Sequence, residues 1–270
     1  MFEGKVACIT GAAGGIGTAV TRALMREGAR CVLSDIDAKA LARLSAEYGD
    51  KALAVRCDIT DPRSVKAMMA KAAKAFGGID ILVNNAGVIT PNLFEDCTAG
   101  EIRRQVEVNL MGPVNCTREA IPYLKKRGGG SVITISSLAG IVPETHSSVY
   151  TATKFALRGF FLTLHIELKK HHIHVATIFP DSVSTPMLKY EADHGGSPLT
   201  FLGTPQKPEQ VARAVVRAIT RKKVELAVPA SQGPLTRLVM VFPGLVAKLW
   251  PLLEKQGAAN KEKMKKAGII

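Results

Sequence analysis

The stretch KVACITGAAGGIG, residues 5–17, decides the fold class of this chain. Its first part, 5–10, is a short β-rich run that predicts a strand, and the glycines of 10–17 follow directly. Glycines at this point let the backbone turn sharply and approach a pyrophosphate, which then lies at the positive end of the next helix. The alternative interpretation is a simple tight turn. The position straight after a first strand favours a dinucleotide site, because the motif requires that context.

Strands and helices alternate along the rest of the chain. Further strands are predicted at 30–35, 52–58, 78–87, 131–137, 174–180 and 224–229, and helices at 37–48, from Asp61 onward, and at 98–126, 149–170 and 207–221. Short apolar strands that are separated by helices indicate a parallel sheet covered on both faces. We therefore expect an α/β, Rossmann-type, doubly wound parallel sheet of seven strands. It forms a single domain over 1–230 with a C-terminal extension over 231–270, and ligands bind beyond the carboxyl ends of its strands.

Composition narrows the possible classes of protein. The chain has 270 residues, 47% of them hydrophobic, and a formal net charge of +13, which points to nucleic acid, an anionic membrane surface or an anionic cofactor as partner. Its five cysteines show no C-x-x-C spacing, and Cys8, Cys31 and Cys57 fall in or beside apolar runs. This pattern favours buried thiols in a reducing compartment over disulfides or metal ligands. The N-terminus does not resemble a signal peptide, so we expect a cytoplasmic protein.

An acidic residue ends the second predicted strand. Asp35 lies eighteen residues beyond Gly17, where a carboxylate can accept hydrogen bonds from the adenosine ribose and would repel a 2′-phosphate. Positions 14 and 36 carry no lysine or arginine that could neutralise such a phosphate. We therefore expect NAD rather than NADP. The alternative is that Asp35 caps the helix that follows Ile36.

The segment YTATK, residues 150–154, places a tyrosine and a lysine one helical turn apart on the same face. A solvated surface pair is the alternative interpretation. A free tyrosine has a pKa of about 10 and is a poor base at pH 7, and a neighbouring cation would lower that pKa. A decrease of about three units corresponds to roughly 4 kcal/mol.

Together, TGAAGGIG (10–17), NNAG (84–87), ITISSLAG (133–140) and YTATK resemble the short-chain dehydrogenase/reductase family. Tyr150 lies thirteen positions after Ser137, as in that family, and the resemblance covers residues 3 to about 230. It implies an NAD-dependent oxidoreductase that moves a hydride between the nicotinamide and a secondary alcohol or ketone.

The resemblance also implies a role for individual residues. Tyr150 would be the acid–base group, and Lys154 would lower its pKa and hold the nicotinamide ribose. Ser137 would orient the substrate oxygen; Ser136 is the neighbouring candidate, but the spacing to Tyr150 selects Ser137. Asn109, in VEVNLMG, would hold a water that links Lys154 to solvent. Cofactor contacts are implied for Tyr150, Lys154, Gly11, Ala13, Gly14, Gly15, Ile16, Gly17, Asp35, Asp58 (adenine amino group), Ile59, Asn85, Ala86, Gly87, Pro180, Val183 and Thr185 (carboxamide), and no metal is expected.

The substrate side departs from the family pattern. Asp181 stands where the family usually has a glycine, which puts the backbone near the nicotinamide in doubt. The segment 186–206 matches a mobile lid, and Gly195 and Gly196 offer a hinge. Its apolar residues favour a lipophilic substrate of steroid, retinoid or long-chain type, although any lid needs apolar residues to close.

The segment 238–253, LVMVFPGLVAKLWPLL, carries one charge and is broken by prolines at 243 and 251, so it is too short for a confident membrane span. With Trp250 and the basic segment 261–266, it could lie in an anionic membrane interface. The alternative is packing on the subunit or across a dimer interface. A homodimer or homotetramer is expected.

Two other functions compete with the enzyme. A catalytically inactive nucleotide-binding regulator would commonly lose one of Asn109, Ser137, Tyr150 and Lys154, and all four are present. A nucleic-acid binder would fit the net charge, but the sequence has no zinc-finger or aromatic–basic RNA motif. A small-molecule substrate and no nucleic-acid partner are therefore expected.

Overall fold

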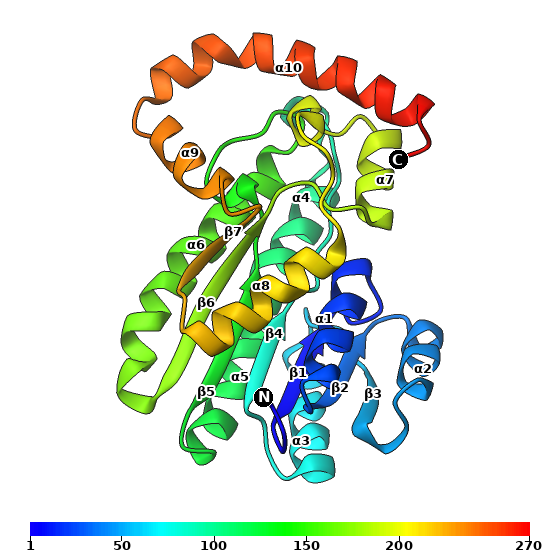
Figure 1. The fold of residues 1–270 in the computed structure, drawn as a ribbon, viewed down its shortest axis with the longest axis vertical. Helices are drawn as coiled ribbons and strands as arrows, with labels where there is room; N and C mark the ends of the chain where they lie inside the picture. The colour runs from blue at the N-terminus through cyan, green and yellow to red at the C-terminus, as the bar shows by residue number, and fades with distance from the viewer.

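The computed structural model describes residues 1–270, except for the side chains of residues 243, 245 and 246. Seven parallel strands form one sheet in the order β3-β2-β1-β4-β5-β6-β7 (Figure 1). The strands are β1 Val6–Thr10, β2 Arg30–Asp35, β3 Ala52–Arg56, β4 Ile81–Asn84, β5 Gly130–Ile135, β6 Ile173–Pro180 and β7 Glu225–Val228. Each lies within or next to its predicted range, and the predicted doubly wound fold is confirmed.

Helices cover both faces of the sheet. One apolar cluster joins it to α1 Gly15–Arg26, α2 Ala38–Ala46 and α8 Pro208–Arg221, and a second joins it to α3 Pro62–Phe76, α5 Gly112–Lys126 and α6 Ser148–Leu168. The central strands are therefore buried on both sides, and all five residues of β1 are buried. Cys8, Cys31 and Cys57 are free thiols in these clusters, as predicted.

Aspartate residues cap the N-termini of α3 and α2, and the cap of α2 decides between the two interpretations of Asp35. Asp61 caps α3 and Pro62 occupies its first turn, as predicted. Asp37 caps α2, accepting hydrogen bonds from the backbone N–H of Lys39 and of Ala40, both at 3.0 Å. The interpretation of Asp35 as this cap is therefore wrong.

The predicted helix 98–126 is not one regular helix. It consists of α4 Ala99–Val106, a π-helical turn η3 Glu107–Met111, and α5. A π-turn inserts one extra residue into the helical ladder, and such turns occur frequently at functional sites. Here the turn carries Asn109, which is completely buried.

The last elements cross the carboxyl end of the sheet. They are α7 Pro186–Asp193, the 3₁₀ turn η6 Pro198–Phe201, α9 Gln232–Val239 and α10 Pro243–Lys266. In Figure 1, α10 arches over the top of the molecule. The expected break at Pro251 is wrong, because α10 continues through this proline. The side chains of residues 243, 245 and 246 in the predicted apolar segment lie outside the described residues.

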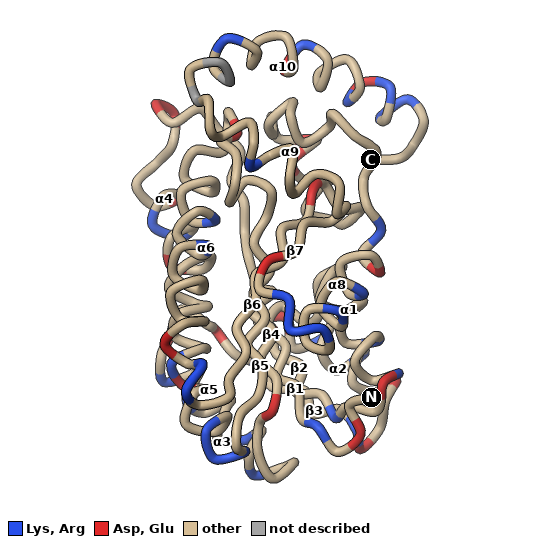
Figure 2. The backbone as a smooth tube through the Cα atoms, turned by 60° about the vertical axis from the view of Figure 1, so that its left-hand side comes forward, with Lys and Arg blue, Asp and Glu red and all other residues tan. Residues whose placement is uncertain are grey.

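The second half of α10 packs on the predicted lid. Asn260 Nδ2 donates to the carbonyl of Leu202 at 3.1 Å, and Gly257 lies so close to η6 that an added Cβ would be 2.0 Å from the carbonyl oxygen of Pro198. Met264 and Ile270 pack against the buried lid cluster of Leu188, Ala192 and Phe201. Among the described residues, no helix combines the length and apolar composition needed to cross a bilayer. Figure 2 shows basic residues along α10 and around the opposite end of the sheet.

Asp80 fixes the amino-terminal edge of the sheet. Its carboxylate accepts hydrogen bonds from the Val6 N–H at 3.0 Å, from Lys5 Nζ at 3.1 Å and from Arg127 Nε at 3.2 Å. Burial by itself would raise the pKa of this carboxyl, but the hydrogen bonds from Arg127, Val6 and Lys5 outweigh burial and leave the pKa below its usual value.

We expect Asp80→Asn to lower the free energy of unfolding by about 1–3 kcal/mol at pH 7, because the buried N–H of Val6 and the partly exposed Lys5 and Arg127 lose a charged acceptor. The native pKa is depressed, so this contribution is present above about pH 4 and is lost as the pH falls through the native pKa. Urea unfolding at pH 7 and at pH 3 measures both effects. The exposed Asp50→Asn is the control, with a change within about 0.5 kcal/mol; equal effects of the two substitutions would contradict the account.

Candidate active site

A cavity of about 690 Å³ lies at the carboxyl edge of the sheet. This volume is within the usual range for cofactor and ligand sites. Of the residues predicted to contact the cofactor, it is lined by Gly11, Gly14, Gly15, Ile16, Asp35, Asp58, Ile59, Asn85, Ala86, Gly87, Tyr150, Lys154 and Thr185. Pro180 and Val183 line a smaller neighbouring cavity, and Ala13 and Gly17 line neither cavity.

The glycine loop can approach its neighbours closely only without side chains. An added Cβ at Gly17 would lie 2.1 Å from the carbonyl oxygen of Gly11, and one at Gly15 would lie 2.8 Å from Thr185 Cγ2. Gly14 is the N-cap of α1 and offers no side-chain partner, which leaves the first N–H groups of the helix for an anion. A loop of this form fits the pyrophosphate of a dinucleotide.

Asp35 lies at the end of β2 beside this loop. Its Oδ2 accepts from the N–H of Ala13 at 3.2 Å and its Oδ1 from the N–H of Asp37 at 3.2 Å. Two arginines of α4, Arg103 and Arg104, line the same cavity, and sequence reasoning missed them. They come from a helix rather than from a strand end, so the positive net charge was the only signal that pointed to them.

The structure brings Asn109, Tyr150 and Lys154 together. Tyr150 and Lys154 are one turn apart on α6, and Lys154 Nζ is 5.3 Å from the centre of the tyrosine ring. Lys154 Nζ donates to the carbonyl of Ile135 at 3.2 Å. A Cβ added to Gly87 would lie 3.4 Å from Asn109 Oδ1 and 3.8 Å from Lys154 Nζ, so the two side chains border the same glycine.

The π-turn holds Asn109 in a fixed orientation. Its Nδ2 donates to the carbonyl of Val88 at 2.8 Å, and its Oδ1 accepts from the N–H of Val88, also at 2.8 Å. A second, longer hydrogen bond runs from Nδ2 to Thr153 Oγ1 at 3.4 Å. Asn109 therefore links α6 to the segment after β4.

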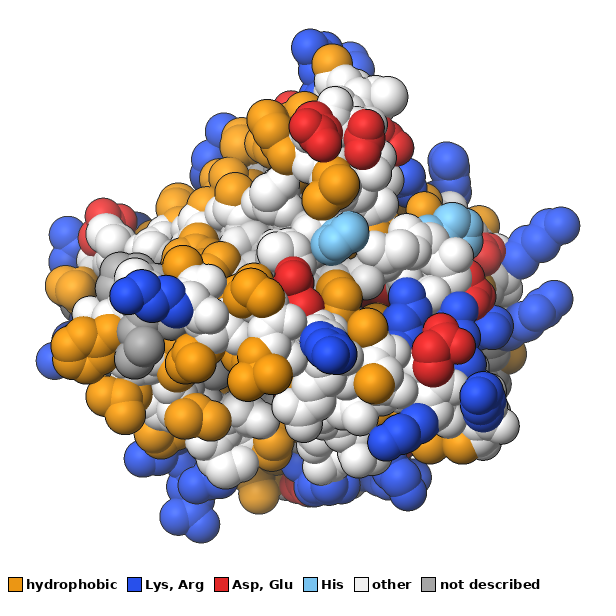
Figure 3. Space-filling model, turned by 90° about the horizontal axis from the view of Figure 1, so that it is seen from above, with side chains coloured by type: hydrophobic (Ala, Val, Ile, Leu, Met, Phe, Trp, Pro, Cys, Tyr) orange, Lys and Arg blue, Asp and Glu red, His pale blue; other side chains and the backbone are white. Residues whose placement is uncertain are grey.

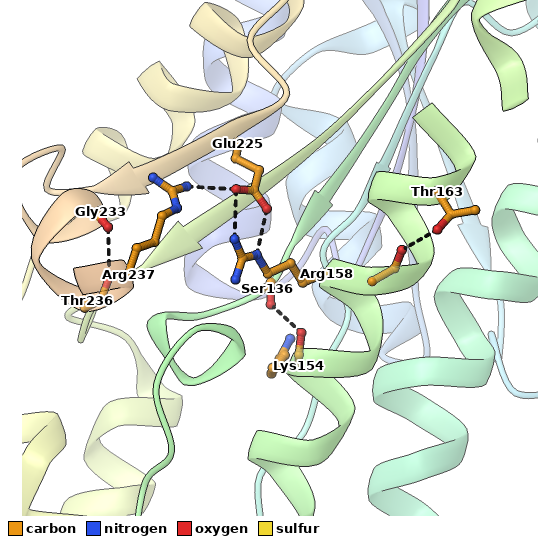
Figure 4. A network of polar contacts seen from close by, with 9 residues as sticks. Ser136, Lys154, Arg158, Thr163, Glu225, Gly233, Thr236 and Arg237 are labelled. Atoms are coloured by element: carbon orange, nitrogen blue, oxygen red, sulfur yellow. Dashed lines mark hydrogen bonds and ion pairs between the residues drawn. The ribbon is translucent and has the colours of Figure 1, made fainter. Parts of the chain in front are cut away.

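Polar contacts also fix the helix that carries Tyr150 and Lys154 (Figure 4). Arg158 Nε of α6 donates to Glu225 Oε1 of β7 at 2.7 Å, and Arg237 Nη2 of α9 donates to Glu225 Oε2 at 2.8 Å. The hydroxyl of Ser136 donates to the carbonyl of Lys154 at 3.2 Å. Ser136 therefore supports the helix and lines both cavities, and its neighbour Ser137 lines the smaller cavity beside Tyr150.

The electrostatic environment differs from the expectation for Tyr150. Burial raises the pKa of Tyr150, the nearby carboxylates of Glu191 and Glu144 raise it further, and a hydrogen bond with Ser137 acts in the opposite direction. Burial lowers the pKa of Lys154 to about 8. Burial therefore dominates the pKa of Tyr150 among the contributions of the protein itself, and the expected lowering by Lys154 and a positively charged nicotinamide stays a prediction.

The substitution of Asp181 for glycine is accommodated without a left-handed backbone. The Asp181 N–H donates to the carbonyl of Val228 at 2.8 Å, and its carboxylate accepts from the N–H of Ser182 at 2.8 Å. These bonds continue the β6–β7 pairing by one residue. The doubt about the local backbone is thereby removed.

Comparison with known proteins places this geometry in a family. The family model described as "short chain dehydrogenase" matches residues 5–195. A 3-alpha-(or 20-beta)-hydroxysteroid dehydrogenase of Mycobacterium tuberculosis is 38% identical over 213 residues, which cover 79% of this chain and 81% of that protein. A trans-4-hydroxycyclohexanecarboxylate dehydrogenase of Sinomonas cyclohexanicum is 38% identical over 192 residues, covering 68% of this chain and 74% of that protein.

A solved structure has the same arrangement of elements. The 3-ketoacyl-(acyl-carrier-protein) reductase of Brucella melitensis, complexed with NADH, superposes with a TM-score of 0.77 at 32% sequence identity. The match covers 84% of this chain and 98% of the reductase. The matched segment of the family model contains the glycine loop, Asn109, Ser137, Tyr150 and Lys154. The chain belongs to the short-chain dehydrogenase family.

Proposed function

We propose that the chain interconverts a lipophilic secondary alcohol and its ketone with NAD(H), and that Tyr150 is the acid–base group. The observation that carries this proposal is that Tyr150 and Lys154 line the same cavity as the glycine loop, while the buried Asn109 borders Gly87 together with Lys154. When bound, the nicotinamide accepts a hydride from the alcohol carbon or returns it to the ketone carbon. The hydroxyl proton is lost or gained in the same conversion, so the protein must supply a group that takes and gives it.

The surroundings of Tyr150 suit the acid form in the ligand-free state. Because burial raises its pKa, the phenol keeps its proton and can give it to a ketone oxygen. Oxidation of an alcohol requires the phenolate, which positive charge nearby would favour. Lys154 is the buried cation one turn away, and its lowered pKa means that it can itself release a proton near neutral pH.

The remaining groups have supporting roles in this proposal. Ser137 orients the substrate oxygen, since its side chain lines the smaller cavity beside Tyr150. Asn109 is fixed by Val88 and borders Gly87 together with Lys154, which suits it to hold a water between Lys154 and solvent. The inactive nucleotide-binding regulator is the competing function, and measurable turnover separates the two.

The lipophilic substrate is supported by the apolar part of the lining of the smaller cavity and by the names of relatives. Ile16, Leu138, Met187 and Leu188 contribute to its lining. Relatives are described as acting on a hydroxysteroid and on a hydroxycyclohexanecarboxylate, both of which are alicyclic alcohols. We therefore propose an alicyclic skeleton.

We expect Tyr150→Phe to lower kcat by about 10²–10⁴-fold while the dissociation constant of NADH stays nearly unchanged, because only the hydroxyl that exchanges the proton is removed. Absorbance of NADH with a panel of alicyclic alcohols measures turnover, and fluorescence titration measures NADH binding. Tyr190→Phe, in the exposed part of α7, is the matched control and should keep full turnover. Retention of more than half the turnover in Tyr150→Phe would remove this residue from the chemistry.

We expect the wild-type chain to prefer NAD, and the double substitution Asp35→Ser with Ile36→Arg to shift the ratio of kcat/KM for NAD and NADP toward NADP by about ten- to a hundredfold. The reason is that a repelling carboxylate is lost and a cationic donor is gained. Ile36→Ser, which adds no cation, serves as the control. A wild-type chain that uses NADP more efficiently than NAD would refute the assignment of Asp35.

We also propose that α9 and the start of α10 attach the chain to an anionic membrane surface. Leu235, Leu238, Val241, Phe242 and Leu252 are each more than half exposed. Lys248 and Lys255 of α10 are also exposed. Figure 3, which views the molecule from the side of α10, shows hydrophobic side chains gathered on this surface. Exposed leucines and nearby lysines both favour an anionic lipid interface.

A homodimer or homotetramer is likewise a proposal. Its support is helix α6, which leaves Phe160, Leu162 and Ile166 exposed; of these, Leu162 and Ile166 lie one turn apart on the same face, with Ile166 at 71%. Contiguous exposed apolar residues of this kind mark interaction surfaces.

We expect Leu238→Ser with Leu252→Ser to reduce co-sedimentation with anionic liposomes by at least about tenfold, because each buried leucine contributes roughly 1.5–3 kcal/mol. Substitution is preferred to truncation, since α10 also covers the lid. Phe94→Ser, similarly exposed at 65% but between β4 and α4, is the control and should sediment like the wild type. If the double variant sediments unchanged, or if it instead dissociates a dimer in ultracentrifugation, α9 and α10 form a packing surface.

A further inference from the structure

The smaller cavity, of about 90 Å³, carries an unusual concentration of carboxyl groups. It adjoins Tyr150 and Ser137, where the proposed function places the substrate. Glu144 enters it from the loop after β5, Asp181 from the end of β6 and Glu191 from α7. Three separate segments therefore direct an acidic side chain to the substrate side of the site.

These carboxyl groups have no cationic partner within the cavity. Among the described residues, no lysine, arginine or histidine lines it, and none of the three carboxyls forms an ion pair. Glu191 accepts one long hydrogen bond, from Thr200 Oγ1 at 3.4 Å, and is 9% exposed. Nor does the described part of the chain hold three His, Cys, Asp or Glu side chains in an arrangement that would bind a metal ion.

Such a group of acids is costly to ionise without a neighbouring positive charge. Burial raises the pKa of Glu144 to about 8, with further increases from Glu191 and Asp181. Burial also raises the pKa of Glu191 to about 7, although the hydrogen bond from Thr200 and the charge of Lys261, which lies outside the cavity lining, act in the opposite direction. A positive charge that enters the cavity would offset both burial and mutual repulsion. It would also relieve the unfavourable effect of these carboxylates on the phenolate of Tyr150.

An independent feature of the same wall points to a ligand with hydrogen-bond donors. Ser182 is 8% exposed and lines the cavity, and its hydroxyl oxygen has no hydrogen-bond partner among the described residues. Buried polar atoms without a partner are uncommon and are costly. An ammonium group, which has three donors and no acceptor, would satisfy this oxygen and two carboxylates at once.

We propose that the substrate is an alicyclic amino alcohol, or the corresponding amino ketone, whose protonated amine lies among Glu144, Asp181 and Glu191 while its oxygen meets Tyr150 and Ser137. This inference rests on the proposed function, since it assumes alcohol–ketone chemistry at Tyr150. The amine takes no part in the transfer of hydride or proton. The same carboxyls disfavour a substrate that carries a carboxylate at this end.

Four cyclohexanols with a matched skeleton test the proposal. They carry at carbon 4, in trans, an amino, a methyl, a hydroxyl or a carboxylate group. We expect kcat/KM for the amino compound to exceed that for the methyl compound by at least about tenfold, as for a charge-assisted hydrogen bond, and the carboxylate to be the poorest substrate. Equal or better use of the methyl compound or of the neutral diol would overturn the proposal.

Two isosteric substitutions assign the effect to the cavity. Glu144→Gln and Glu191→Gln should each lower the ratio of kcat/KM for the amino and methyl compounds by about tenfold, whereas Glu167→Gln, exposed on α6, should leave the ratio unchanged. A ratio that neither cavity variant changes would overturn the proposal, and using two variants guards against misfolding of one.

Calorimetry distinguishes this inference from the proposed function. The amino compound should bind to the NADH-loaded chain more tightly than the methyl compound, and more weakly after Glu144→Gln. If this pattern holds but no alcohol is oxidised, cation recognition stands and the proposed function fails. If the methyl compound is oxidised and the amino compound neither binds nor reacts, the proposed function stands and the inference fails.

Discussion

The hydrogen bonds of the Asn85 side chain are the interaction on which the site depends. Its Nδ2 donates to the carbonyls of Thr10 at 3.0 Å and of Gly11 at 2.9 Å, and so ties the end of β4 to the end of β1. Between these two strands the chain order of the sheet reverses direction, because β2 and β3 lie on one side and β5 to β7 on the other. A crevice opens at such a switch point in any doubly wound sheet. Asn85 fixes its walls, and the glycine loop and Gly87 therefore face a common space.

The two cavities that Tyr150 lines differ in the charged residues around them. The larger one is lined by the cationic groups of Lys154, Arg103 and Arg104, together with Asp35, Asp58 and Glu107. The smaller one is lined by acidic groups alone among the described residues that carry charge. Tyr150 belongs to both. Burial and the neighbouring carboxylates raise the pKa of Tyr150. A charged ligand group in either cavity would therefore shift this pKa further, because Tyr150 lines both cavities.

Patterns of local origin were predictable from the sequence, and features created by long-range packing were not. Each strand was predicted because its apolar run is bounded by turn residues. Tyr150 and Lys154 were predicted to be neighbours because residues four apart in a helix lie on the same face. The π-turn at Asn109 was missed, since one extra residue barely disturbs the helical period. Glu144 and Glu191 were missed because nothing local marks an acid that only tertiary structure buries. Pro251 was misjudged, because the second half of α10 is held on the lid, and a helix anchored in this way can tolerate one missing hydrogen bond near its exposed start.

The packing of α10 on the lid has a consequence for the order in which the chain matures. During synthesis the lid residues Leu188, Ala192 and Phe201 leave the ribosome well before Met264 and Ile270, which cover them. Domains generally fold as their segments emerge, so the sheet through β7 can assemble while the lid is still uncovered. The nascent chain thus passes through a stage in which the nucleotide-binding half is formed and the substrate side is open. Chaperones that recognise exposed apolar surface would meet the protein at that stage.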